Sequence, residues 1–350
     1  MLELRDAGAR VGGAWAIRGF RLRVEPGELL VLLGPPGAGK TTALRALAGL
    51  LAPEEGEARL DGAPIAALAP SKRGIAVVFQ GLALWPHLTA FEHLALGLRA
   101  RGEASGDVSW RVAETLEAFG LEALAGRRPG HLDADQRLRL ALARALVVRP
   151  RVLLLDEPLA GLAGELRAVL RAELKRLYRE RGIPFVHATR DAEDAMALAS
   201  RLALVEGGRV VQVGAPLEVY RRPRTRGAAE ITGALNALHG VMGSGPGGRQ
   251  VRLRDGLRLL VGPTDARDGW EVTCVVRPES VQLGAMEARG VNRFLATVAD
   301  VAWAPGRWTC HVLLPGEVVL RVDLPPTAAP PKPGEQVSVL LPAEDVIVLE

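Results

Sequence analysis

The sequence predicts an α/β domain built on a mostly parallel sheet, followed by a small all-β barrel or sandwich. Before about residue 235, short apolar runs alternate with segments of helical periodicity, whereas after it only short runs of alternating polarity remain. The length points the same way, because 350 residues exceed what one ordinary hydrophobic core supports. We therefore predict two domains, at residues 1–234 and 235–350.

The first domain alternates strand signals with helix signals. Short apolar runs predict buried strands at residues 27–33, 75–79, 152–155, 184–188 and 202–205. Periodic segments predict helices, of which the clearest are residues 40–51, 137–148 and 166–181. Strands that alternate with helices in this way form mostly parallel sheets with helices on their faces.

The second domain has no helical periodicity. Runs of alternating polarity predict strands at residues 251–253, 257–261, 271–276, 295–301, 309–314, 318–324 and 336–340. Turn signals such as Pro315-Gly316 and Pro333-Gly334 separate these runs. Cys274 and Cys310 lie in strand-like runs, and we expect them to be buried as small hydrophobic residues rather than to form a metal cluster.

The composition excludes several classes of protein. A hydrophobic content of 48% with 24% charged residues is typical of a soluble globular chain, and no run approaches the ~18 apolar residues of a membrane span. The first residues, MLELRDAGAR, carry charges where a signal peptide has its apolar core, which predicts a cytoplasmic protein. A formal net charge of +4 without a basic stripe does not indicate a nucleic-acid partner.

The strongest motif is GPPGAGKTT at residues 34–42. It follows a predicted strand and precedes a predicted helix, which is the context that a phosphate-binding loop requires. Its glycines allow backbone N–H groups to surround phosphate oxygens at the positive end of a helix. Lys40 is placed to reach the β- and γ-phosphates, and Thr41 to ligate Mg²⁺. The motif therefore predicts ATP and Mg²⁺ as ligands.

A second motif, LLLDEP, supplies two carboxylates at the carboxyl end of the strand at residues 152–155. Ligands of open α/β sheets bind at this end of the strands. Asp156 suits the Mg²⁺ shell, and Glu157 is placed to orient or deprotonate an attacking water. Lys40 and Asp156 are 116 positions apart (156 − 40), and this interval is longer than a minimal P-loop ATPase needs.

That interval carries a resemblance to a known family. The segments FQGLALWPHLTAFEHLALGLR and DQRLRLALARALVVRPRVLLLDEPLAGL, together with VVRPES in the second domain, resemble the ATPase subunits of ABC importers that end in a TOBE domain. The resemblance covers nearly the whole chain. It implies an ABC-type P-loop domain with a helical subdomain at about residues 81–148, and an OB-like β-barrel as a regulatory domain.

The resemblance also implies roles for individual residues. Gln80 is implied to sense Mg²⁺ and the attacking water, and Asp156 to ligate the metal with Thr41. The residues implied to hold the phosphates and Mg²⁺ are Gly34, Gly37, Ala38, Gly39, Lys40, Thr41 and Thr42.

The resemblance further implies partners and a location. Two ATPase subunits, identical or different, are implied to enclose two ATP molecules head to tail. Residues 81–98, from Gly81 to Leu98, are implied to contact an integral membrane permease, which links the chain indirectly to a solute-binding protein. The location is then the inner face of the cell membrane. GALN at residues 233–236 resembles the polyamine, ferric-ion and sulfate branches.

The family's signature LSGGQ is LDADQ in this chain, at residues 132–136. In the family this segment approaches the γ-phosphate of the opposite subunit. Asp133 and Asp135 place carboxylates there, which repel a triphosphate, and Ala134 adds a side chain that hinders close approach. Gln136 matches the family.

Three further positions also depart from the family. Ala163 stands where the family has an aspartate, and Arg190 stands at its switch histidine. We expect His187, three residues earlier, to be a core or edge residue of its strand. The position of the adenine-stacking aromatic aligns with Val11, while Trp15 is a candidate either for stacking on adenine or for packing against the sheet.

Two functions follow from these matches and departures. The chain is either the energising ATPase of an importer, as Glu157 favours, or a regulatory subunit that binds ATP with little hydrolysis, as LDADQ, Ala163 and Arg190 favour. One hypothesis of compensation pairs Arg190 with Asp135 of the opposite subunit and places Arg190 at the γ-phosphate. Another is that a partner ATPase with an intact signature completes the site.

Overall fold

The computed structural model describes residues 1–162, 164–253, 256–286 and 290–350. The chain divides into two compact units, residues 1–219 (unit 1) and 220–350 (unit 2). The domain limits of residues 1–234 and 235–350 stay a prediction.

Unit 1 contains a six-stranded sheet with the order β10-β9-β3-β8-β7-β6. The strands from β9 to β6 pair in parallel, and only β10 is antiparallel to its neighbour, so the predicted mostly parallel sheet is confirmed. The strands are β3 (Leu29–Leu33), β6 (Ile75–Val78), β7 (Val152–Asp156), β8 (Phe185–Thr189), β9 (Arg201–Glu206) and β10 (Arg209–Gly214).

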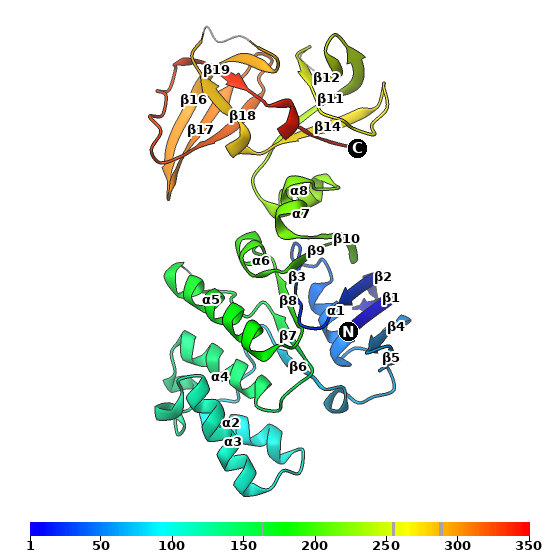
Figure 1. The fold of residues 1–350 in the computed structure, drawn as a ribbon, viewed down its shortest axis with the longest axis vertical. Helices are drawn as coiled ribbons and strands as arrows, with labels where there is room; N and C mark the ends of the chain where they lie inside the picture. The colour runs from blue at the N-terminus through cyan, green and yellow to red at the C-terminus, as the bar shows by residue number, and fades with distance from the viewer. Residues whose placement is uncertain (163, 254–255, 287–289) are drawn as a thin grey trace. The chain divides into compact units, whose positions relative to one another are not determined.

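A second, antiparallel sheet of unit 1 escaped the sequence analysis. Its order is β2-β1-β4-β5, with β1 (Leu2–Val11), β2 (Ala14–Val24), β4 (Glu55–Leu60) and β5 (Ala63–Pro64). Helix α1 (Lys40–Ala48) contacts strands of both sheets (Figure 1). Phe20, Leu44 and Val186 belong to the buried core that these elements share.

The remaining helices of unit 1 include those that the sequence predicted and three that it did not delimit. They are α2 (Ala90–Arg99), α3 (Ser105–Ala118), α4 (Ala134–Leu146), α5 (Gly164–Arg181) and α6 (Ala192–Leu198). α2 contacts both α3 and α4, which gives the predicted helical subdomain its packing (Figure 1). Helix α7 (Pro216–Arg221) crosses the division between the units.

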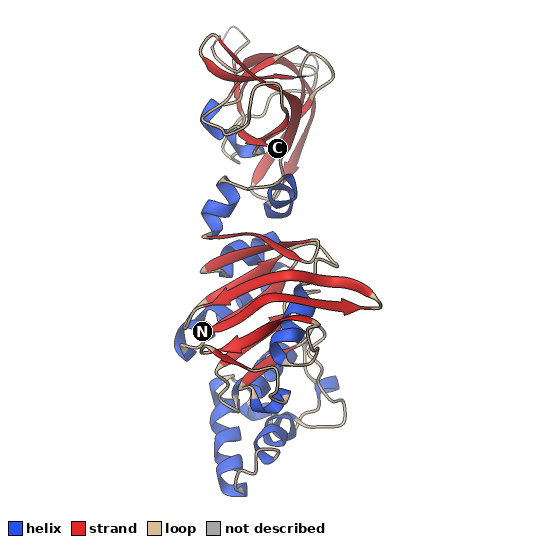
Figure 2. Ribbon diagram, turned by 90° about the vertical axis from the view of Figure 1, so that its right-hand side faces the viewer, coloured by secondary structure: helices blue, strands red, loops and turns tan. Residues whose placement is uncertain are grey.

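After the last residues of α7, unit 2 contains α8 (Arg226–Thr232), and strands dominate it from residue 236 onward (Figure 2). Two five-stranded sheets have the orders β13-β12-β11-β14-β20 and β15-β19-β16-β17-β18. Side chains from both sheets form one apolar core, which includes Leu238, Cys274, Cys310 and Val339, so the predicted all-β domain is confirmed and both cysteines are buried.

The strands of unit 2 include three, β11, β15 and β20, that the sequence analysis did not predict. The ten strands in the described part of unit 2 are β11 (Asn236–Gly245), β12 (Gly248–Leu253), β13 (Arg258–Leu260), β14 (Glu271–Val276), β15 (Gln282–Gly284), β16 (Arg293–Ala304), β17 (Arg307–Leu313), β18 (Val319–Leu324), β19 (Gln336–Leu340) and β20 (Ile347–Leu349). Within the described ranges, no helix is both long enough and apolar enough to cross a bilayer.

Candidate functional site

The loop at residues 34–42 connects β3 to α1 and is shaped by close backbone approaches. Gly37 and Gly39 have positive φ angles of 78° and 101°. A Cβ atom on Gly34 would lie 2.2 Å from the carbonyl oxygen of Val205, and one on Gly39 would lie 2.6 Å from that of Ala16. Glycine is therefore required at two positions of the loop for steric reasons, before any ligand is considered.

Lys40 is the first residue of α1 and is only 5% exposed. Its Nζ donates hydrogen bonds to the carbonyl oxygens of Gly34 at 2.7 Å and Pro35 at 2.9 Å. Burial lowers the pKa of Lys40, while the nearby carboxylates of Glu157 and Asp156 oppose that shift. Carbonyl oxygens of the loop thus hold the ammonium group of Lys40 in place.

Thr41 and Asp156 meet although they are 115 residues apart in the sequence. The Thr41 hydroxyl donates to Oδ1 of Asp156 at 2.9 Å. Asp156 ends the buried strand β7 and is itself 5% exposed. Burial raises the pKa of Asp156, and the hydrogen bond from Thr41 opposes this. A hydroxyl and a carboxylate side by side are hard oxygen ligands of the kind that Mg²⁺ prefers, so this pair fits the ion.

Glu157 directly follows β7 in a left-handed backbone conformation, with φ of 46°. Its N–H donates to the carbonyl oxygen of Ala188 on β8 at 2.9 Å. Its side chain is 15% exposed, and Oε2 lies 3.6 Å from Nε of Arg190. Gln80 lies two residues beyond Val78, which pairs with Leu155 in the sheet. Gln80 and Glu157 therefore follow neighbouring parallel strands at the same edge of the sheet.

Two cavities of unit 1 reach Glu157. One of about 370 Å³ is also lined by Arg190, Arg167 and Asp194. The other, of about 470 Å³, extends to the turn after Gln80 and to the first turn of α4. Arg167 lies 2.6 Å from Asp194, and the sequence analysis singled out neither residue. Nothing local marks the pair, because one lies on α5 and the other on α6.

The segment LDADQ forms a complete helix cap. Asp133 is the N-cap of α4: its Oδ1 accepts from the N–H of Gln136 at 2.8 Å, and its own N–H donates to Oε1 of Gln136 at 3.1 Å. Asp135 pairs with Arg139 at 2.9 Å, and Arg139 lies 3.3 Å from Glu173 of α5. The carboxylates of Asp133 and Asp135 therefore offset the partial positive charge at the N-terminus of α4, which makes this helix end a weaker binding site for an anion.

Arg190 and Asp135 both have partners in their own chain, Glu157 and Arg139 respectively. The hypothesised pairing of Arg190 with Asp135 across two subunits stays a prediction. Ala163 lies outside the described residues. His187 is 1% exposed on β8, which confirms that it is a core residue, and neither of its ring nitrogens has a hydrogen-bond partner in the described part of the chain.

The two adenine candidates lie on the antiparallel sheet. Val11 ends β1 and is 54% exposed. Trp15 lies on β2, where the guanidinium carbons of Arg10 and Arg18 are 4.4 and 4.8 Å from its ring centroid. A Cβ on Gly8 would be 3.0 Å from the indole, so the ring also covers this glycine of β1. These contacts are those of a side chain packed on a sheet surface.

Residues 81–98 form an anchored loop and most of α2. Arg144 of α4 donates to the carbonyl oxygen of Leu82 at 2.8 Å, which helps hold that residue at a φ of 65°. The buried His93 ring accepts from the N–H of Trp85 at 2.9 Å, and burial lowers the pKa of His93. Trp85 itself is 42% exposed. The loop thus presents an aromatic side chain from a fixed backbone.

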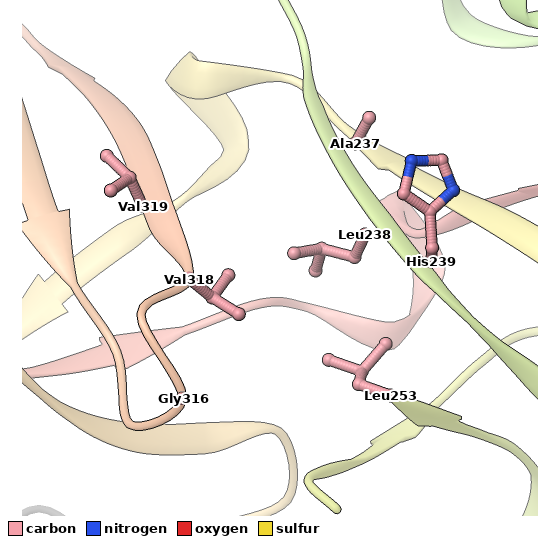
Figure 3. A pocket seen from close by; sticks show the side chains of 7 residues that line it. All are labelled: Ala237, Leu238, His239, Leu253, Gly316, Val318 and Val319. Carbon is pink, nitrogen blue, oxygen red and sulfur yellow. The ribbon is translucent and has the colours of Figure 1, made fainter. Parts of the chain in front are cut away.

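Unit 2 has a cavity of about 470 Å³ that is lined by residues of β11 and β12 and by the segment that leads into β18 (Figure 3). The aliphatic side chains of Leu238, Leu253 and Val318 point into it, whereas the imidazole of His239 points away. The RPE motif has a structural task instead. Buried Arg277 donates to carbonyl oxygens, including that of Ala229 at 2.9 Å, and thereby ties α8 to β14.

Comparisons with known proteins agree with this geometry. The chain matches the ABC transporter family at residues 17–160 and the TOBE domain at residues 274–349. It is 40% identical to the spermidine/putrescine import ATP-binding protein PotA of Rubrobacter xylanophilus, over 99% of this chain and 93% of the relative. It is 39% identical to the sulfate/thiosulfate import ATP-binding protein CysA 2 of Chromobacterium violaceum, over 95% of this chain and 91% of the relative.

Solved structures resemble unit 1. The dimeric ATP-binding cassette MJ0796, bound to ADP and Pi in a post-hydrolysis state, superposes with a TM-score of 0.56 at 29% identity. The match covers 62% of this chain and 99% of that cassette. The cbiO1 subunit of a Clostridium perfringens ABC transporter gives 0.57 at 27% identity, over 63% of this chain and 90% of its own.

Proposed function

The chain belongs to the ATP-binding subunits of ABC importers, and on that premise we propose that it binds Mg²⁺-ATP at residues 34–42 and drives a membrane permease by dimer closure and hydrolysis. The observation that carries the proposal is the contact between Thr41 and Asp156 beside the buried Lys40. It joins the phosphate loop to the second carboxylate motif, which lie far apart in the sequence.

The loop residues divide the work of holding the nucleotide. The backbone N–H groups of Gly37, Ala38, Gly39 and Thr42 face the phosphates, and Lys40 offsets their negative charge. Thr41, Asp156 and Gln80 hold the metal. Mg²⁺ supplies charge stabilisation at the phosphate oxygens when it is bound. Adenine is placed against Val11, by apolar contact, or against the exposed side of the Trp15 ring on the antiparallel sheet.

Glu157 is the general base of this proposal. It lies at the carboxyl edge of the sheet, lines both cavities of the site and has a backbone fixed by the carbonyl oxygen of Ala188. Its role is to orient and deprotonate the attacking water, while Gln80 from the adjacent strand helps to position that water. Arg190, the residue that follows β8, forms an ion pair with Glu157 at 3.6 Å.

The proposed partners follow from the exposed loop and from the relatives. Residues 81–98 present Trp85 and contact the permease, and two ATPase subunits close on two nucleotides. The membrane association is at the inner face, through that permease, with an extracytoplasmic solute-binding protein as an indirect partner. The relatives named above serve spermidine/putrescine or sulfate/thiosulfate import, and we propose a solute of one of these two classes.

A second candidate function is supported by the cap of α4. Asp133 and Asp135 reverse the charge that the signature segment offers to an opposing nucleotide. In this alternative the chain is a regulatory or hydrolysis-impaired subunit. It binds ATP at its own loop but needs a partner ATPase with a neutral signature for turnover.

Calorimetric titration with Mg²⁺-ATP and a phosphate-release assay together test the proposal, on the chain alone and with its permease. Lys40→Ala should weaken ATP binding by at least about 100-fold, or ~2.7 kcal/mol, because the triphosphate loses its buried cation. Lys72→Ala, at an exposed lysine, is the control. Unchanged affinity in Lys40→Ala contradicts the nucleotide site. Tight binding with phosphate release only in the presence of a second ATPase favours the alternative.

A further inference from the structure

Arg190 combines a loose ion pair with free hydrogen-bonding capacity. Its Nε lies 3.6 Å from Oε2 of Glu157, which is an ion-pair distance but too long for a hydrogen bond. The Arg190 side chain is 59% exposed, against 15% for Glu157. Within the described residues, the guanidinium donates no hydrogen bond. An arginine remains protonated at any ordinary pH, so this residue acts as a fixed charge and not as a proton carrier.

The two residues before Arg190 connect its strand to the phosphate loop and to Glu157. The carbonyl oxygen of Thr189 accepts from the N–H of Gly34 at 3.4 Å, and that of Ala188 accepts from the N–H of Glu157. β8 thus bonds both to the phosphate loop and to the residue that carries the carboxylate. The pKa of Lys40 is lowered chiefly by burial and to a smaller extent by Arg190, so the two cations lie within electrostatic reach.

The other carboxylates near Arg190 are already engaged. Asp156 accepts the Thr41 hydroxyl, while Asp191 and Asp194 lie 3.0 and 2.6 Å from Arg167. Glu157 has no ion-pair partner besides Arg190 in the part of the chain that the structure describes. Among the described residues, Arg190 and Glu157 therefore have only each other as ion-pair partners. An ion pair with one mostly exposed member is weak.

We infer that Arg190 exchanges partners: it pairs with Glu157 when no triphosphate is bound and moves to the terminal phosphate when ATP enters, which releases the Glu157 carboxylate. The inference rests on the proposed function and adds a control step to it. Hydrogen bonds between a guanidinium and a phosphate are charge-assisted and often paired, and are therefore stronger than the 3.6 Å contact that they replace. The base is thereby freed only beside a nucleotide that carries a γ-phosphate.

Nucleotide affinities in a double-mutant cycle test this exchange. AMP-PNP and ADP are titrated into four proteins: wild type, Arg190→Ala, Glu157→Gln and the double variant. Arg190→Ala should weaken AMP-PNP binding about tenfold and leave ADP binding within about twofold, because only the former has the phosphate that Arg190 reaches. Glu157→Gln should tighten AMP-PNP binding about tenfold when Arg190 is present and at most about threefold when it is absent.

Two control variants make the result decisive. Arg179→Ala, at an exposed arginine near the end of α5, should change neither affinity. Arg190→Lys should restore part of the preference for AMP-PNP over ADP, because it keeps the charge. The inference is overturned if Arg190→Ala weakens both nucleotides equally, or if Glu157→Gln has the same effect in both backgrounds. A wild-type chain that binds neither nucleotide overturns the proposed function itself, and the inference with it.

Discussion

The phosphate loop and the signature segment of this chain satisfy different demands. Around the phosphate loop, Lys40 and Asp156, the proposed contacts of a triphosphate and a metal, are buried, although burial opposes the charge of both. In the signature segment, Asp133 gives α4 a full capping box, which is what the helix needs. Its charge is the opposite of what an opposing γ-phosphate needs. Serine and aspartate are almost equally good N-cap residues, so the stability of α4 does not determine which of the two stands at position 133.

The two regions also differ in burial and in whether their polar side chains have hydrogen-bond partners. The strand β8 beside the phosphate loop contains His187, fully buried and without a hydrogen-bond partner for either ring nitrogen among the described residues. Apart from the buried Leu132, the signature segment is exposed or half-buried, and Asp133, Asp135 and Gln136 all have partners. The first region is therefore stabilised by the rest of the core, whereas the second is stabilised by its own cap.

The largest effect that would test this contrast concerns His187. Burial, and to a lesser degree Arg167, lowers the pKa of His187 to about 4 from an ordinary 6.5. The unfolded chain then binds a proton between pH 6.5 and 4 that the folded chain excludes, so stability falls as the pH falls through this window. The loss approaches about 3 kcal/mol at pH 4. His187→Leu should remove it, and urea unfolding at pH 7.5, 6 and 5 measures the difference.

His131→Leu, at an exposed histidine before α4, is the matched control and should leave the pH dependence unchanged. At pH 7.5, His187→Leu should be neutral or slightly stabilising, because it removes two unpaired polar atoms from the core. If the wild type and His187→Leu lose stability in parallel as the pH falls, the burial of His187 does not cause the loss of stability.

A second effect concerns turnover. Changing Asp133 to serine and Asp135 to glycine removes two negative charges from the first turn of α4 and keeps an N-cap side chain. ATP hydrolysis should rise about tenfold, which corresponds to ~1.4 kcal/mol, because an opposing phosphate is no longer repelled. ATP affinity at the chain's own loop should stay within about twofold. Phosphate release and calorimetry measure the two quantities.

The matched control is Asp107→Ser, which removes an acidic side chain from the first turn of α3. It should leave hydrolysis unchanged. An unaltered rate in the Asp133→Ser, Asp135→Gly protein would show that the acidic signature does not limit turnover, and that its difference from the phosphate loop has no catalytic consequence.

The same contrast explains what the sequence could predict. The phosphate loop is contiguous, and the meeting of Thr41 with Asp156 follows from the rule that ligands bind at the carboxyl edge of a parallel sheet. The pairing of Arg190 with Glu157 was not predictable, because it depends on two adjacent strand ends and on side-chain conformations. The N-terminal antiparallel sheet escaped the sequence analysis because irregular registers interrupt the alternation of β1.

The smallest effect separates the two demands on Asp133. Asp133→Ala removes the acceptor of the Gln136 N–H and should destabilise unit 1 by about 1 kcal/mol, whereas Asp133→Ser should cost less than about half of that. Both variants remove the charge, so both should raise hydrolysis by the same factor. Urea unfolding then distinguishes serine from alanine, and phosphate release distinguishes aspartate from both. If stability and turnover instead change together across the three side chains, the cap and the charge are not separate properties of this position.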